Sequence, residues 1–193
     1  MIYLQIFLTG LVLFNQVLYI RAISVGRSSS TAVTWLIWSF VNAVMSWTQY
    51  KSGNTASAVV IAAYSFGALG SFVYSMKKGR WKLSAVQVAC LVISLTALSV
   101  AIFSSKVLAI SINVSAHFVG TVPIFLLVFA RKSREPIECW VIWLVASSSN
   151  LLIALYGKEL LIAPVYYCVH NIILVSLLLA LQTKEKKNIN DTV

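Results

Sequence analysis

Tryptophan, asparagine and histidine side chains inside long apolar stretches are the residues of this sequence best suited to chemistry. Two sets of such residues recur at steps of three and four, a spacing that places each set on one face of a helix. The first set is Trp35, Trp38, Asn42, Ser46 and Gln49, and the second is Trp140, Trp143, Ser147 and Asn150. Indole rings pack against the rings of a bound molecule, and amides hydrogen-bond its hydroxyl groups. The pattern therefore indicates a binding site for a small polar molecule.

Further polar side chains lie in the neighbouring apolar stretches. They are Asn113, His117 and Thr121; Tyr167, His170 and Asn171; Tyr64, Ser65 and Ser71; and Gln5, Thr9, Asn15 and Gln16. Lipid cannot satisfy a buried amide or imidazole, so each such group should face protein or a water-filled path. We therefore expect a central cavity. Its predicted substrate-binding residues are Trp38, Asn42, Trp143, Ser147, Asn150, His117, His170 and Asn171.

The chemistry expected of these side chains is binding and not catalysis. An intramembrane enzyme would need paired histidine and carboxylate groups or an activated serine, and neither arrangement is visible. His117 and His170 could form a proton relay, but a relay normally uses a carboxylate, and the interiors of the apolar stretches contain none. We therefore expect both histidines to hydrogen-bond protein or substrate. Cys90, Cys139 and Cys168 lack metal-ligand spacing, so no metal or cofactor is expected.

The tryptophans have a second interpretation as membrane anchors. Tryptophans within one turn of a membrane interface usually anchor the helix there, which we expect for Trp35, Trp47 and Trp140. Trp38 and Trp143 lie deeper, and the sequence leaves anchoring and cavity lining equally open for them.

The asparagines have an alternative of the same kind. Asn42 and Asn150 could line a cavity or could simply join two helices by a hydrogen bond. Asn171 lies near the middle of its stretch beside His170, so we expect it to line the cavity.

Glycine and proline positions also predict local structure. Gly67 and Gly70 should allow close approach of two helices. Pro123 and Pro164 free backbone carbonyl groups inside their helices, and they could act either as hinges or as static kinks.

The composition places the chain in a membrane. Hydrophobic residues make up 60% of the 193 residues and charged residues 10%, which leaves too little polar surface to cover a water-soluble globule. The net charge of +10 does not indicate nucleic-acid binding, because the basic residues are scattered between apolar runs and do not share one face. The expected partners are the lipid bilayer and a small-molecule substrate, and no nucleic acid.

Charged and turn-rich clusters divide the chain into seven stretches long enough to span a bilayer as helices. They fall at 2–21, 32–50, 55–76, 83–104, 107–130, 137–156 and 160–182. The weakest break, Ser104-Ser105-Lys106, leaves open one long bent helix and six spans. The expected fold is an all-α membrane protein with seven transmembrane helices.

The basic residues predict an orientation in the membrane. Twelve of the fifteen fall in the first, third and fifth connections and in the tail: Arg21, Arg27, Lys77, Lys78, Arg80, Lys82, Arg131, Lys132, Arg134, Lys184, Lys186 and Lys187. The other connections hold only Lys51, Lys106 and Lys158. Because connections rich in lysine and arginine stay in the cytoplasm, we expect an outside N-terminus and a cytoplasmic C-terminus in a cell membrane, inner or plasma.

A repeat with an offset of 105 residues organises the chain. Its copies are Arg27-Ser28 followed by Trp35-x-Ile37-Trp38, and Lys132-Ser133 followed by Trp140-x-Ile142-Trp143. The offset pairs the first three spans with the last three, and the single span between them makes the two repeats parallel. We expect a first three-helix repeat at 1–80, a linker helix at 81–106, a second three-helix repeat at 107–183 and a cytoplasmic tail at 184–193.

This arrangement of three, one and three helices resembles the SWEET sugar transporters and their relatives, the PQ-loop and PnuC vitamin transporter families. Pro123 followed by Lys132-Ser133 is similar to the PQ-loop pattern, with Ile124 at the glutamine position. In the first repeat, Leu18-Tyr19 stands where Pro-Gln would be. The string Trp35-x-x-Trp38-x-x-x-Asn42 is similar to one found in PnuC proteins.

The resemblance implies a substrate held near the midplane between the two repeats. In these families an asparagine of the third helix and tryptophan or small polar groups of the second helix hold it. Asn171 matches the former, whereas the first repeat has Ser65 or Phe66 at that place. The residues that match the latter are Trp38, Asn42, Trp143 and Ser147.

The expected function is a transporter for a small uncharged polar solute, such as a sugar or a ribosyl vitamin or nucleoside-like molecule, working by alternating access. The absence of an intramembrane carboxylate favours facilitated diffusion. A photoreceptor would need a Schiff-base lysine within a span, and Lys184 falls past the last one. The alternative is a non-transporting seven-helix receptor of the same fold, which should carry charge in its cavity. The exact solute, the flux direction, ion coupling, trapping by a cytoplasmic kinase and formation of a homo-oligomer stay open.

Overall fold

The protein is all-helical. The computed structural model describes residues 2–28, 31–79, 83–130 and 135–190, and for 182–190 it describes the backbone alone. Within these ranges the helices are α1 (Ile2–Ser24), α2 (Ala32–Lys51), α3 (Thr55–Lys77), α4 (Ala85–Ile102), α5 (Lys106–Phe129), α6 (Ile137–Tyr156) and α7 (Ile162–Asn190).

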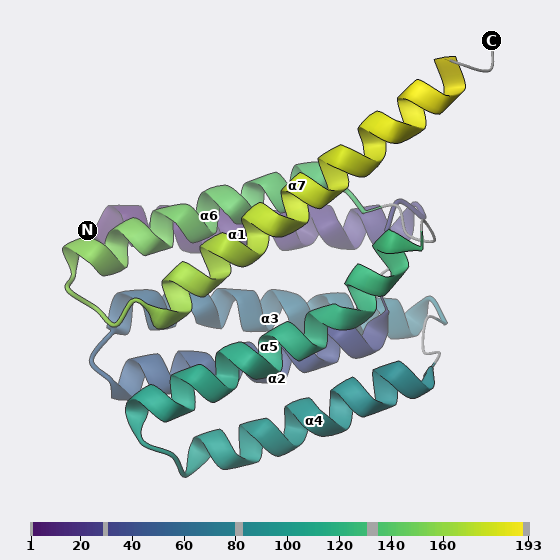
Figure 1. Cartoon of the computed structure of the whole chain (residues 1–193). Coiled ribbons are helices and arrows are strands. Elements are labelled where there is room, and N and C mark those ends of the chain that lie inside the picture. The colour runs from purple at the N-terminus through teal and green to yellow at the C-terminus, as the bar shows by residue number, and fades with distance from the viewer. Residues whose placement is uncertain (1, 29–30, 80–82, 131–134, 191–193) are drawn as a thin grey trace.

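Successive helices run in opposite directions along a common axis. The N-terminus and the C-terminus therefore lie at opposite ends of the helices (Figure 1). A tight turn allows the reversal between α2 and α3, where Gly53 has a φ of 81°. This left-handed backbone conformation costs glycine little because it has no Cβ atom.

Six of the helices in the described ranges are long and apolar enough to cross a membrane: α1, α3, α4, α5, α6 and α7. The chain is therefore a multi-pass membrane protein. α2 is not among these six, and its polar residues Thr34, Asn42 and Gln49 are buried. Because α2 contacts α3, α4 and α5, its polar side chains can face protein and not lipid.

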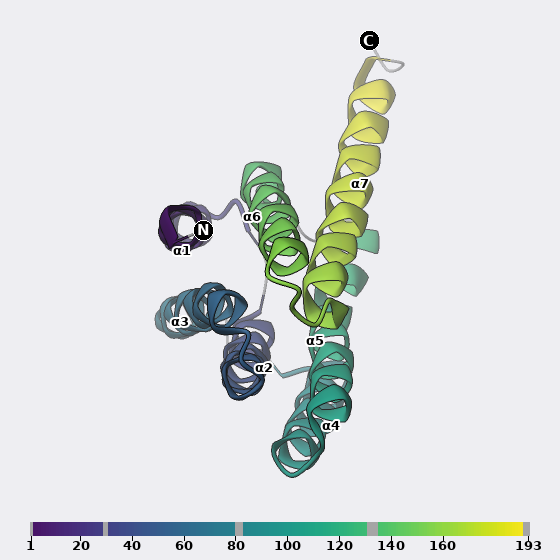
Figure 2. The same cartoon turned by 90° about the vertical axis from the view of Figure 1, so that its left-hand side faces the viewer.

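The helices pack in two groups. α3 packs against both α1 and α2, and α7 packs against both α5 and α6. Between the groups, α2 contacts α5 and α1 contacts α6, whereas α4 packs on the outside against α5 and α2 (Figure 2). We refer to α1–α3 as the first three-helix unit, to α5–α7 as the second three-helix unit, and to the boundary between them as the seam.

Two glycines mark close contacts between helices. A Cβ atom on Gly67 of α3 would lie 2.0 Å from Cγ of Gln16 on α1. A Cβ atom on Gly120 of α5 would lie 2.6 Å from Cγ2 of Ile37 on α2. The expected close approach is thus confirmed at Gly67, whereas Gly70 has its nearest neighbour, Ile20 Cδ1, at an ordinary 3.5 Å.

The helix boundaries settle three expectations from the sequence. The break at 104–105 separates two helices, so the alternative of one long bent helix is wrong. The last helix continues to Asn190, beyond the expected end at 182. Pro164 lies in the first turn of α7, where its missing N–H breaks no helical hydrogen bond, so the expected kink or hinge there is wrong. Pro123 lies inside α5, as expected.

Part of the repeat motif and of the basic set falls outside what the structure describes. Lys132-Ser133, Arg80, Lys82, Arg131 and Arg134 lie outside the described residues, and Lys184, Lys186 and Lys187 lie where only the backbone is described.

Candidate functional site

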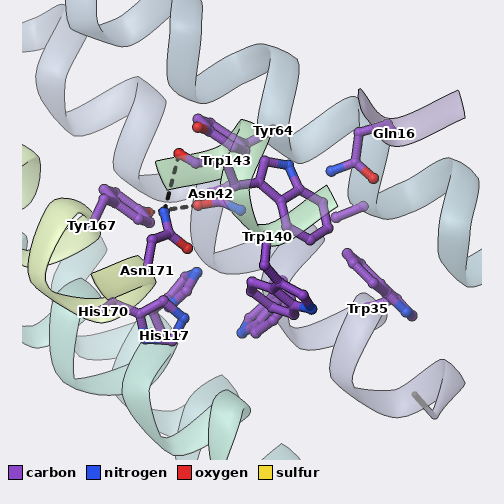
Figure 3. A pocket seen from close by; sticks show the side chains of 12 residues that line it. Gln16, Trp35, Asn42, Tyr64, His117, Trp140, Trp143, Tyr167, His170 and Asn171 are labelled. Carbon is purple, nitrogen blue, oxygen red and sulfur yellow. Dashed lines mark hydrogen bonds between the residues drawn. The ribbon is translucent and has the colours of Figure 1, made fainter. Parts of the chain in front are cut away.

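A small cavity lies at the seam, and among the described residues every helix except α4 contributes to its wall. The lining residues are Gln16, Trp35, Trp38, Asn42, Tyr64, Ala68, His117, Trp140, Trp143, Tyr167, His170 and Asn171 (Figure 3). None of them is Asp, Glu, Lys or Arg. The volume open to the centre of a water molecule is about 40 Å³.

Four tryptophans, here named the tryptophan cluster, form one wall of this cavity. Trp35 and Trp38 come from α2, and their ring centroids are 5.1 Å apart. Trp140 and Trp143 come from α6, with centroids 4.7 Å apart. The two pairs meet across the seam, because Trp35 lies 6.0 Å from Trp143 and Trp38 lies 6.1 Å from Trp140. The i, i+3 spacing puts both members of each pair on one helix face.

Two asparagines join the helices beside this cluster. The Tyr167 hydroxyl donates to Oδ1 of Asn42 at 2.6 Å, which ties α7 to α2. Asn171 Nδ2 donates to the Trp143 carbonyl oxygen at 3.3 Å (Figure 3). It also donates to Ser147 Oγ at 3.1 Å, so Asn171 ties α7 to α6. Each asparagine therefore lines the cavity and joins helices, so the two sequence interpretations are not exclusive.

Two histidines face each other at the same level. The ring of His117 stacks on Trp38 with centroids 5.2 Å apart and planes 5° apart. The His117 and His170 ring centroids are 5.2 Å apart. His117 Nδ1 lies 3.0 Å from the Tyr166 hydroxyl, so one of these two groups donates to the other. The site thus combines flat aromatic faces with polar ring nitrogens.

Several polar atoms around the cavity have no hydrogen-bond partner among the described residues. They are Nε1 of Trp38, Trp140 and Trp143, Oη of Tyr64, and Nε2 of His170. Burying such a group without a partner costs about 1–3 kcal/mol, so proteins rarely leave five of them together. Water or a bound molecule that accepts hydrogen bonds would remove this cost.

Comparisons with known proteins found no matching family model, no similar curated protein and no similar solved structure. The interpretation of this site therefore rests on its own geometry.

The structure brings six of the eight predicted substrate-binding residues to the cavity wall: Trp38, Asn42, Trp143, His117, His170 and Asn171. Ser147 is buried behind the wall as the hydrogen-bond acceptor of Asn171. Asn150 is buried as well, but it is not among the lining residues.

The expected interface role is wrong for Trp35 and Trp140. They are 1% and 2% exposed and line the cavity, because the helix face they share with Trp38 and Trp143 points into the seam. The repeat itself could have indicated this, since each deeper tryptophan has its partner three residues earlier in both copies. Trp47, in contrast, is 55% exposed near the end of α2, as expected of an anchor.

Sequence reasoning also missed a buried carboxylate. Glu135 accepts hydrogen bonds from the hydroxyl groups of Tyr19 and Ser28, and all three residues are buried. It immediately precedes Pro136 and α6, in a cluster that looks like a solvated connection from the sequence alone.

Proposed function

We propose that this protein is a membrane transporter that moves a small uncharged polar solute across the bilayer by alternating access. The observation that carries the proposal is the cavity at the seam, with its uncharged wall and its unpartnered indole N–H groups. The proposed substrate-binding residues are the lining residues Trp38, Asn42, Trp143, His117, His170 and Asn171.

The chemistry of the wall defines the solute class. Indole N–H groups only donate hydrogen bonds, so the solute must offer acceptors such as hydroxyl, carbonyl or ring nitrogen atoms. The faces of the tryptophan cluster favour a molecule with a ring. A fixed charge on the solute would meet no opposite charge in the wall. A sugar, or a ribosyl vitamin or nucleoside-like molecule, meets these requirements.

The small size of the cavity supports alternating access. A cavity volume of about 40 Å³ is far below that of a typical ligand pocket, so binding of a sugar requires the two units to move apart. The uncharged wall supports facilitated diffusion, in which the concentration gradient of the solute supplies the driving force.

We propose that all seven helices cross the membrane and that the two units are parallel repeats joined by α4. Under the 105-residue offset, the contact of α2 with α5 corresponds to that of α6 with α1. The packing of α3 on α1 and α2 likewise corresponds to that of α7 on α5 and α6. In this proposal α2 is a span whose polar residues are sheltered by its neighbours.

The proposed orientation follows from the charged ends of the helices. Arg21, Arg27, Lys77 and Lys78 lie toward the same end as the C-terminus, which we place in the cytoplasm. The α4–α5 connection then lies outside, so a Ser105→Cys variant should react with a membrane-impermeant thiol reagent on intact cells. Reaction only after permeabilisation of the cells would show that the protein has the opposite orientation in the membrane.

Uptake by the purified protein in liposomes tests the function. Radiolabelled neutral sugars and nucleosides should enter down their gradient, and a protonophore should not change the rate. Asn171→Ala and Trp38→Ala should each lower uptake at least about tenfold, since each removes hydrogen bonds or a ring face at the solute. Trp47→Ala, an exposed tryptophan on the same helix as Trp38, is the matched control and should retain uptake.

Two outcomes would count against the proposal. An uptake rate that neither Asn171→Ala nor Trp38→Ala changes would show that the solute does not bind at the proposed site. Binding of a neutral solute without uptake of any would favour the non-transporting receptor.

A further inference from the structure

A buried hydrogen-bond network joins the two units beside the tryptophan cluster. The carboxylate of Glu135 accepts from the hydroxyl of Tyr19 and, at 3.2 Å, from Oγ of Ser28, and Ser28 Oγ lies 2.8 Å from Tyr19 Oη. Tyr19 and Ser28 are 0% and 1% exposed and Glu135 is 6% exposed. Hydrogen bonds to an ionised acceptor in such surroundings are among the strong ones.

This network touches the tryptophan cluster directly. The Tyr19 ring lies 4.7 Å from Trp35 and 5.1 Å from Trp143, measured between centroids. Tyr19 belongs to α1 of the first three-helix unit, whereas Glu135 precedes α6 of the second. The two units therefore cannot separate at this end until the bonds to Glu135 break.

A second carboxylate joins the units at the opposite end. Glu159, in the connection after α6, accepts a hydrogen bond from the hydroxyl of Ser57 in the first turn of α3. α6 is thus flanked by two glutamates, and a hydroxyl group of the first three-helix unit binds each of them. Both sets of hydrogen bonds are made in this structure.

We propose that Glu135 and Glu159 are alternating latches, and that releasing one of them opens the cavity toward its own end of the molecule. The proposal rests on the proposed transport function, because it assigns the residues that control access to the same cavity. α6 carries Trp140 and Trp143, so movement of either end of α6 moves part of the cavity wall. The repeated pattern of a basic residue followed by serine gains a role here in its first copy, since Ser28 donates a hydrogen bond to Glu135.

Replacing one latch should shift the population toward the state open at that end. Glu135→Gln keeps the shape of the side chain but removes the charge that strengthens its bonds to Tyr19 and Ser28. Glu138→Gln is the matched control. Its carboxylate pairs with Arg27 at 2.6 Å across the same seam. Because both side chains are about half exposed, this ion pair contributes little to holding the two units together.

A reporter cysteine in the cavity measures the opening without any solute. Ala68 lines the cavity and is 1% exposed, so Ala68→Cys adds one sulfur atom to the wall. The natural cysteines are first replaced as Cys90→Ala, Cys139→Ala and Cys168→Ser. The full-length protein is reconstituted in one orientation, and a membrane-impermeant thiol reagent is added to either face. Ser105→Cys identifies the face of the α4–α5 connection.

If the two glutamates are latches, each substitution should raise labelling from a different face of the membrane. Glu135→Gln should raise the labelling rate at position 68 of the Ala68→Cys variant about tenfold from the face of the α1–α2 connection, and Glu159→Gln should raise it by a similar factor from the other face. Tyr19→Phe, which keeps the ring and removes one hydroxyl group, should act as Glu135→Gln does but more weakly. Glu138→Gln should leave both rates within about twofold of the parent.

The outcome separates the latches from the transport function. Equal labelling from both faces in Glu135→Gln and Glu159→Gln, or an effect of Glu138→Gln as large as that of Glu135→Gln, would overturn the latches even if the parent protein takes up solute. The predicted changes in labelling would support the latches even if no neutral solute is taken up, in which case only the proposed function fails. If Glu135→Gln is unfolded, as judged by gel filtration, Tyr19→Phe decides the question.

Discussion

At the scale of single residues, the cavity is marked by polar atoms that have no hydrogen-bond partner among the described residues. Tyr64 and Tyr167 show the contrast, because their rings stack with centroids 6.2 Å apart. The Tyr167 hydroxyl donates to Asn42, whereas the Tyr64 hydroxyl is buried without a partner among the described residues. A buried hydroxyl without a partner lowers the stability of the protein, but it can form a hydrogen bond with a ligand in the cavity.

Tyr64→Phe should therefore stabilise the protein and weaken solute binding. Without the unpaired hydroxyl, folding buries only apolar atoms at this position. We expect the free energy of unfolding, measured by thermal unfolding in detergent, to rise by about 1 kcal/mol. The concentration of solute giving half-maximal uptake should rise about three- to tenfold. The control Tyr167→Phe should lose about 1 kcal/mol, because it leaves Asn42 without its donor. A lower unfolding temperature for Tyr64→Phe would show that its hydroxyl has a structural role.

Most of the residues of the cavity wall could be predicted from sequence, because lipid leaves a mid-span amide or imidazole few other places to face. The roles of Trp35 and Trp140 could not be predicted, since a tryptophan near a helix end is equally compatible with an interface and a packed seam. The Tyr19–Glu135 bond was also hidden, because its partners are 116 positions apart and nothing local to either residue marks the pair.

At the scale of helices, boundaries were predictable where charge and turn-forming residues coincide. The sequence predicts spans at 32–50 and 137–156, and the structure has α2 at Ala32–Lys51 and α6 at Ile137–Tyr156. The end of α7 was not predictable, because Lys and Glu are good helix formers and continue a helix after the apolar stretch ends. The effect of Pro164 was not predictable either, since it depends on whether the helix has already begun.

The close packing of α1 on α3 at Gly67 predicts a position-specific effect of adding one methyl group. Gly67→Ala should destabilise the protein by about 1–3 kcal/mol in detergent thermal unfolding, because the new Cβ would overlap the Gln16 side chain and push the helices apart. Gly70→Ala, one turn along the same helix, meets its first neighbour at 3.5 Å and should be neutral or slightly stabilising. Equal effects of the two changes would contradict the described packing.

At the scale of the whole molecule, the two three-helix units enclose a polar site that neither could form alone. Four tryptophans, two from α2 and two from α6, meet only because the units pack along the seam. A hydrogen bond to a glutamate also joins the two units at each end of α6. The central claim is that a neutral solute occupies this enclosed space on its way across the membrane.

Protection of the cysteine in Ala68→Cys by solute tests that claim most directly. Labelling of the variant by a small thiol reagent is measured in the cysteine-free background with and without the solute found to be taken up, beside Ser105→Cys in the α4–α5 connection as control. We predict that saturating solute slows labelling at position 68 severalfold and leaves labelling at position 105 unchanged. Uptake of a solute that does not protect position 68 would contradict the account, because that solute would then cross the protein by another route.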